Sequence, residues 1–83
     1  MKKYLVDVYL PAANRHLNVF LPSTKEIGEV TRLLVSAAES LADGSYRGTA
    51  DAMLLDAKTG QPFVLTATVE EAGIRSASHL ILI

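Results

Sequence analysis

Residues 68–83 read TVEEAGIRSASHLILI, and this stretch decides the fold. Residues 70–73 predict a single helical turn, which ends at a glycine. A lone isoleucine, Ile74, follows the turn, and the chain then closes on residues 80–83. Those four residues are all apolar, which is typical of a strand covered on both faces. We therefore expect residues 80–83 to lie in the middle of a β-sheet.

Two runs near the N-terminus predict a β-hairpin. Residues 4–10 and 16–21 are rich in β-branched, aromatic and leucine side chains, and residues 11–14 interrupt them. Alternation along each strand predicts two faces. The inner face comprises Val6, Val8, Leu10, Leu17, Val19 and Leu21. The outer face comprises Leu5, Asp7, Tyr9, His16, Asn18 and Phe20.

The next segment predicts an amphipathic helix. Ser23 and Glu26 have the spacing of a capping box, in which each side chain bonds the other's backbone N–H. Asp43 and Gly44 predict the end of the helix, with Gly44 in a left-handed conformation. Gly28 inside the helix indicates either a close approach of backbone or simple tolerance. The apolar stripe at helical spacing comprises Ile27, Val30, Leu34, Ala38 and Leu41.

Residues 53–55 and 63–65 predict two short strands, joined by a turn at residues 58–61 in which Gly60 takes positive φ. The predicted order is strand, strand, helix, strand, strand, short turn, strand. A helix of this length after a hairpin must cover the apolar face of the sheet. We expect one α+β domain over residues 1–83, with a mixed five-stranded sheet and one main helix packed on one face.

This order resembles the β-grasp, or ubiquitin-like, fold. Within that group the chain is similar to the small YukD/EsaB proteins of bacterial type VII secretion systems. The strings that carry the likeness are VDVYLP at 6–11, VFLP at 19–22, LDAKTG at 55–60, and Gly73-Ile74 followed by SHLILI at 78–83. The resemblance implies a cytoplasmic accessory protein that docks on a cytosolic domain of a secretion membrane component. The sequence itself has no apolar run near the ~20 residues needed to span a bilayer, so we expect no insertion into the membrane.

Conjugation and sulfur transfer need a flexible tail ending in Gly-Gly, whereas the sequence ends at Ile83. We expect Ile83 to be hydrogen-bonded within the sheet, so the protein binds partners without being attached to them. One alternative is a ubiquitin-like modifier or sulfur carrier. The other is an isolated ubiquitin-like regulatory domain of a different system.

Composition argues against several other classes of function. The net charge is −1 with basic and acidic residues interspersed, so we expect no nucleic-acid partner. The chain has no cysteine, which excludes disulfides and thiolate zinc sites. Lys58-Thr59-Gly60 lacks the accompanying Ser-x-x-Lys of a β-lactamase and predicts only a turn. We expect no catalytic residue, no cofactor and no metal.

The outer face of the sheet is the predicted docking surface, formed by Leu5, Tyr9, Phe20, Leu54, His79 and Ile81. An apolar patch interrupted by polar groups marks an interaction surface, although scattered exposed apolar residues are the plain alternative. His79 is expected near Asp7 on that face, as a solvated pair. The free side of the second strand, residues 16–20, is the other predicted surface, where another chain could pair and form a weak homodimer.

Overall fold

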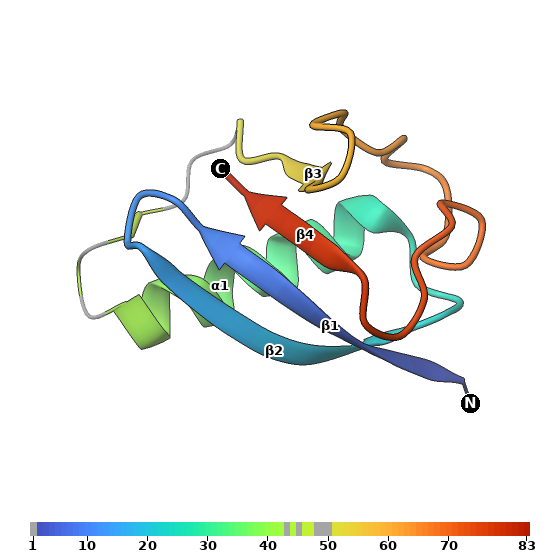
Figure 1. The fold of residues 1–83 in the computed structure, drawn as a ribbon, viewed down its shortest axis with the longest axis horizontal. Helices are drawn as coiled ribbons and strands as arrows, with labels where there is room; N and C mark the ends of the chain where they lie inside the picture. The colour runs from blue at the N-terminus through green and yellow to red at the C-terminus, as the bar shows by residue number, and fades with distance from the viewer. Residues whose placement is uncertain (1, 43, 45, 48–50) are drawn as a thin grey trace.

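The computed structural model describes residues 2–42, 44, 46–47 and 51–83. The described chain forms a four-stranded sheet with one helix packed against it (Figure 1). Its elements, in chain order, are β1 (Lys3–Leu10), β2 (Arg15–Pro22), α1 (Ile27–Ala42), β3 (Leu54–Asp56) and β4 (His79–Leu82).

The N-terminal hairpin is confirmed. β1 and β2 pair antiparallel in one unbroken register from Lys3 opposite Pro22 to Leu10 opposite Arg15. Asn14 takes a φ of 49° in the connecting turn, a left-handed conformation that asparagine adopts more readily than most residues. The predicted inner face is buried, with Val19 packed at the edge of the core.

β4 lies in the middle of the sheet, as the apolar run predicts. The strand order is β2-β1-β4-β3, and β4 pairs parallel with β1 and antiparallel with β3 (Figure 1). Leu80 and Leu82 point into the core and are almost fully buried. The first and last strands, β1 and β4, therefore lie side by side in the centre of the sheet.

The prediction of a fifth strand at residues 63–65 is wrong. The described chain has only an isolated bridge there, between Leu55 and Pro62. Proline has no N–H with which to extend a ladder. The carbonyl oxygens of Leu65 and Ala67 instead accept hydrogen bonds from Gly28 N (2.9 Å) and Ile27 N (2.8 Å). The segment is therefore used to cap the helix and not to widen the sheet.

The same contacts correct the predicted start of the helix. α1 begins at Ile27, and its first two N–H groups are bound by the 65–67 backbone, so the Ser23–Glu26 capping box does not form. A Cβ at Gly28 would lie 3.4 Å from the Leu65 carbonyl oxygen, which supports the close-approach interpretation. Gly44 has a φ of 89°, as predicted, whereas Asp43 lies outside the described residues.

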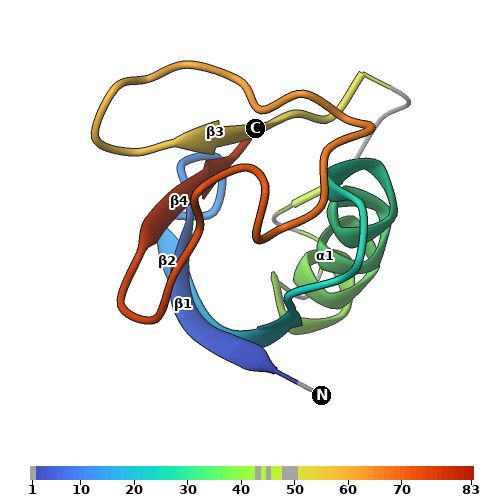
Figure 2. The ribbon, with the colours of Figure 1, turned by 90° about the vertical axis from the view of Figure 1, so that its right-hand side faces the viewer.

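The predicted apolar stripe of α1 is correct for four of its five members. Ile27, Val30, Leu34 and Ala38 are buried against the sheet. Leu41 is 56% exposed and does not belong to the stripe. Figure 2 shows α1 lying along one side of the curved sheet, while no described helix or strand lies on the other side.

The predicted single turn at residues 70–73 is confirmed, with Gly73 at a φ of 84°. A capping box is present here: Thr68 N donates to Glu71 Oε1 (2.8 Å) and Glu71 N donates to Thr68 Oγ1 (3.1 Å). Ile74 follows and is buried in the core. The turn therefore anchors the long connection between β3 and β4.

Candidate protein-docking face

The outer face is the side of the sheet turned away from α1. Strand alternation places Leu5, Asp7 and Tyr9 of β1 on it, with His16 and Phe20 of β2. Phe20 is 64% exposed and Leu5 is 43% exposed, while Tyr9 is partly buried between its neighbours. The other members include Asn18, Leu55, His79 and Ile81.

One member of the predicted surface is misplaced. Leu54 is 2% exposed and belongs to the core, because it pairs with the inward-facing Leu82. Leu55, opposite Ile81, takes the outward position in its place. A shift of one residue moves every side chain of a strand to the other face, and a strand of three residues has too little pattern to fix its own register.

The centre of the outer face is a polar cluster around Asp7. Its Oδ2 atom lies 2.8 Å from His16 Nδ1 and 3.5 Å from His79 Nδ1. His79 is the direct neighbour of Asp7 on β4, so the predicted proximity of these two residues is confirmed. His16 lies diagonally across from Asp7 on β2, a contact that strand alternation alone does not predict.

Tyr9 extends this cluster toward the hairpin turn. Its ring lies 4.7 Å from that of His16 between centroids, and its hydroxyl donates to Asn14 Oδ1 at 2.9 Å. His16 is therefore held by a carboxylate on one side and an aromatic ring on the other. The arrangement orders the polar centre of the face without burying it.

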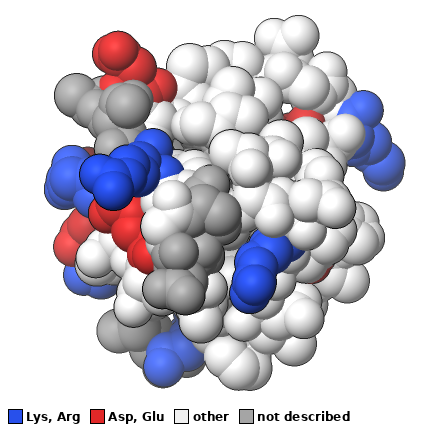
Figure 3. All heavy atoms as spheres, turned by 90° about the vertical axis from the view of Figure 1, so that its left-hand side faces the viewer, with Lys and Arg blue, Asp and Glu red and all other residues white. Residues whose placement is uncertain are grey.

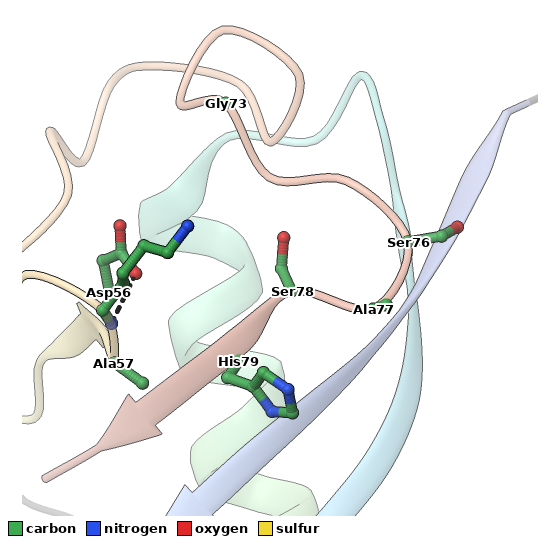
Figure 4. A pocket seen from close by; sticks show the side chains of 8 residues that line it. Asp56, Ala57, Gly73, Ser76, Ala77, Ser78 and His79 are labelled. Atoms are coloured by element: carbon green, nitrogen blue, oxygen red, sulfur yellow. Dashed lines mark hydrogen bonds between the residues drawn. The ribbon is translucent and has the colours of Figure 1, made fainter.

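A hollow of about 610 Å³ lies beside the face, between the β3 end and the loop before β4 (Figure 4). Its lining residues include Asp56, Lys58, Ser76, Ser78 and His79. Figure 4 shows the Ser78 hydroxyl and the His79 ring pointing in different directions, so they do not form a nucleophile–base pair.

Two polar side chains of the hollow take part in local turns. Asp56 Oδ1 accepts from Lys58 N at 2.9 Å, and Ser78 Oγ accepts from Arg75 N at 3.0 Å. Within residues 2–42, 44, 46–47 and 51–83, no three His, Cys, Asp or Glu side chains are arranged to hold a metal ion. The two hydrogen bonds hold the loops that line the hollow.

Charge is spread thinly over the end of the molecule that carries the hairpin turn. Figure 3 shows basic and acidic groups scattered among uncharged atoms, and the residues described on that end form no broad surface of one sign. Tight binding to phosphate backbones relies on clustered basic residues. The described part of the chain also contains no helix with the length and apolar character needed to cross a membrane.

The last residue is held by the sheet. Ile83 N donates to Met53 O at 3.0 Å, and Met53 N donates to Ile83 O at 3.0 Å. This reciprocal pair continues the β3–β4 ladder beyond the last strand residue, Leu82. The expectation that Ile83 is bonded within the folded body is confirmed.

The chain matches no known protein-family model. It also matches no curated protein sequence. Similarity therefore rests on solved structures.

Two similar structures are ubiquitin-like domains of mycobacterial proteins. The EccD5 ubiquitin-like domain from Mycobacterium xenopi has a TM-score of 0.75 at 16% identity, over 100% of this chain and 94% of that chain. The ubiquitin-like domain of the Mycobacterium tuberculosis type VII secretion system protein EccD1 has a TM-score of 0.69 at 18% identity, over 100% and 99%.

A third similar chain belongs to a toluene 4-monooxygenase complex, with a TM-score of 0.77 at 10% identity, over 98% of this chain and 96% of that chain. These identities establish the fold alone. The chain has the ubiquitin-like β-grasp fold, and that fold serves proteins of different function.

Proposed function

We propose that this chain is a non-conjugating ubiquitin-like accessory protein of a type VII secretion system, of the YukD/EsaB type, which acts by docking. The observation that carries the proposal is the outer face. Leu5 and Phe20 are exposed apolar side chains around the Asp7 cluster, on a sheet face that no described element covers. Two of the similar structures are EccD domains, which supports the choice of system.

The face suits protein binding because it combines an apolar rim with a polar centre. Aromatic and aliphatic side chains such as Phe20 and Ile81 supply area to bury, and desolvating them favours association. Asp7, His16 and His79 offer hydrogen-bonding groups that select a partner with matching polarity. The rigid sheet holds these groups in place, which limits the entropy lost on binding.

The role we propose is non-enzymatic. The protein works in the cytoplasm and binds a cytosolic domain of a membrane component of the secretion machinery. The EccD domains support this role, because they are ubiquitin-like domains and EccD1 is a type VII secretion system protein. This chain acts there by non-covalent contact.

The main alternative is a ubiquitin-like modifier or sulfur carrier. Intact mass spectrometry of the protein from its native cell separates the two functions. We expect an unmodified C-terminus and no ladder of conjugates, while a terminal thiocarboxylate or covalent adducts would reject docking as the function.

The other alternative is a regulatory domain or subunit of a different system. The likeness to a chain of a monooxygenase complex favours it. The deciding experiment is affinity purification of the tagged chain from its native cell, with mild cross-linking and identification of the co-purifying proteins. We expect membrane components of the secretion machinery, and enrichment of oxygenase subunits in their place would contradict the proposal.

A further inference from the structure

β2 is an edge strand of the sheet, and one side of it pairs with no described strand. Asp7 N donates to Ser78 O at 3.0 Å, and Leu5 O accepts from Ala77 N at 2.8 Å, so the odd residues of β1 face the β4 side. The even residues of β1 therefore bond the odd residues of β2, and the even residues of β2 point their N–H and C=O groups out of the sheet. Figure 1 shows β2 at the border of the sheet, with no strand of the described chain beyond it.

The middle of this edge, between Arg15 and Pro22, lacks the usual protection against pairing with another chain. Exposed edges are normally blunted by bulges, short strands, prolines or charged side chains. β2 has eight residues, and its register with β1 contains no bulge. Between Arg15 and Pro22 it carries no acidic residue, lysine or arginine.

We propose that β2 pairs antiparallel with β2 of a second copy of this chain, about a two-fold axis at Asn18. This register sets His16 opposite Phe20 of the other copy, and Asn18 opposite its own counterpart. Each outward N–H at positions 16, 18 and 20 then meets an outward C=O. The two sheets join into one, and the inference goes beyond the docking function without depending on it.

Charge and side-chain chemistry favour a second copy as the occupant. A two-fold axis brings like residues together, so a charge near its centre would repel its counterpart. The residue at the axis is Asn18, whose amide carries both donors and an acceptor and so complements itself. Phe20, 64% exposed in the single chain, lies across from His16 of the other copy, which forms an aromatic cross-strand pair.

A groove of about 180 Å³ between β2 and α1 adds apolar surface beside the edge. Its rim includes Leu33, which is 59% exposed. In the paired arrangement the grooves of both copies adjoin across the new junction. Pairing through one edge strand covers less surface than a standard specific interface of about 1,600 Å², so the dimer is weak and depends on concentration.

A single introduced cysteine tests this register, because the natural chain has none. Asn18→Cys places two thiols across the axis at a separation that a disulfide can span. The matched control is Leu5→Cys, on the same outer face but on β1, inside the sheet. Under mild oxidation we expect Asn18→Cys to form dimers about tenfold faster than Leu5→Cys. Equal rates would overturn the proposal.

Sedimentation velocity on the unmodified chain supplies the second measurement. We expect the average mass to rise toward that of a dimer as concentration approaches about 1 mM. Phe20→Lys, which places a charge at the junction, should stay monomeric over the same range while keeping its circular dichroism spectrum. A parent chain that stays monomeric would contradict the proposal, and this is the result expected if the edge accepts only strands of other proteins. A Phe20→Lys variant that dimerises like the parent would also contradict it.

Discussion

Asp7 shows how strand register determines the neighbours of a single residue. Alternation predicts its outward position, and the predicted order of the first and last strands predicts His79 beside it. The contact with His16 is diagonal and depends on the side-chain rotamer as well as on register, so pattern alone does not reveal it. The prediction that Leu54 lies on the outer face is wrong for a related reason, because a strand of three residues has too little pattern to fix its register.

Ala77 is held in a conformation that suits glycine. Its φ is 72°, in a turn closed by the hydrogen bond from Ser78 N to Arg75 O (3.1 Å). The left-handed conformation costs a residue with a Cβ about 1–2 kcal/mol, and the added freedom of glycine in the unfolded chain returns about 0.4–1 kcal/mol of that. We therefore expect Ala77→Gly to raise the free energy of unfolding by about 0.5–1 kcal/mol in urea denaturation.

Ala12→Gly is the matched control for this substitution. Ala12 is also an exposed alanine in a turn, but its φ is not positive. The same change there should lower the free energy of unfolding, because only the unfolded chain gains freedom. Equal effects at positions 12 and 77 would show that the conformation of Ala77 carries no strain.

The raised pKa of Tyr46 predicts a loss of stability in alkaline solution. Burial and, to a lesser extent, the negative charge of Glu39 raise the pKa of Tyr46 above its usual 10.0. The folded protein therefore binds the phenolic proton more tightly than the unfolded chain does. This contribution is fully present below about pH 10 and is lost as pH rises through the higher folded-state pKa.

The comparison is urea denaturation of the parent and of Tyr46→Phe at pH values from about 9 to about 11.5. We expect the free energy of unfolding of the parent to fall more steeply with pH than that of the variant. The Tyr46 hydroxyl is buried without a hydrogen-bond partner among the described residues, so its removal should not destabilise the protein at neutral pH. Parallel pH profiles would contradict the raised pKa.

At the scale of elements, the hairpin and the helix were predictable because their patterns are long. Eight-residue strands and a 16-residue helix repeat their apolar period several times, which fixes both type and face. The start of α1 was not predictable from local sequence, because its first N–H groups are bound by carbonyls some 40 residues away, at Leu65 and Ala67. The capping signal at Ser23 and Glu26 gives way to this tertiary contact.

The two possible capping boxes give a matched pair of substitutions. Glu71 accepts a hydrogen bond from Thr68 N, so Glu71→Ala should lower the free energy of unfolding by about 1 kcal/mol. Glu26 is also exposed but forms no such contact among the described residues. Glu26→Ala should therefore change the free energy of unfolding by less than about 0.5 kcal/mol. A larger loss at Glu26 than at Glu71 in urea denaturation would contradict the observed start of α1.

Burial on α1 can be tested with two leucines of the same helix. Leu34 is buried against the sheet, so Leu34→Ala should cost about 2–5 kcal/mol of unfolding free energy. Leu41 is exposed, and Leu41→Ala should cost less than about 0.5 kcal/mol. Thermal or urea denaturation measures both, and similar losses would mean that the apolar stripe includes Leu41 as the sequence pattern suggested.

At the scale of the whole molecule, the β-grasp fold was predictable because the order of elements and the central apolar strand constrain the topology. The candidate site was predictable in outline for Leu5, Tyr9, Phe20, His79 and Ile81, which lie on the outer face. That these residues bind a partner stays a prediction. The fold leaves function open, since it also occurs in a chain of a monooxygenase complex.

The central claim is that the outer face docks on a cytosolic domain of the secretion machinery. Calorimetric titration of purified domains tests it, with Ile81→Glu and Leu5→Glu on the face and Leu65→Glu as the control. Leu65 is exposed on a loop that caps α1, away from the face. Melting temperatures first confirm that each variant folds.

We expect the parent and Leu65→Glu to bind alike, and both face variants to bind at least about tenfold more weakly, because each introduces a charge that binding would desolvate. Binding that is unchanged in Ile81→Glu and Leu5→Glu, or an absence of binding by the parent to every such domain, would contradict the account.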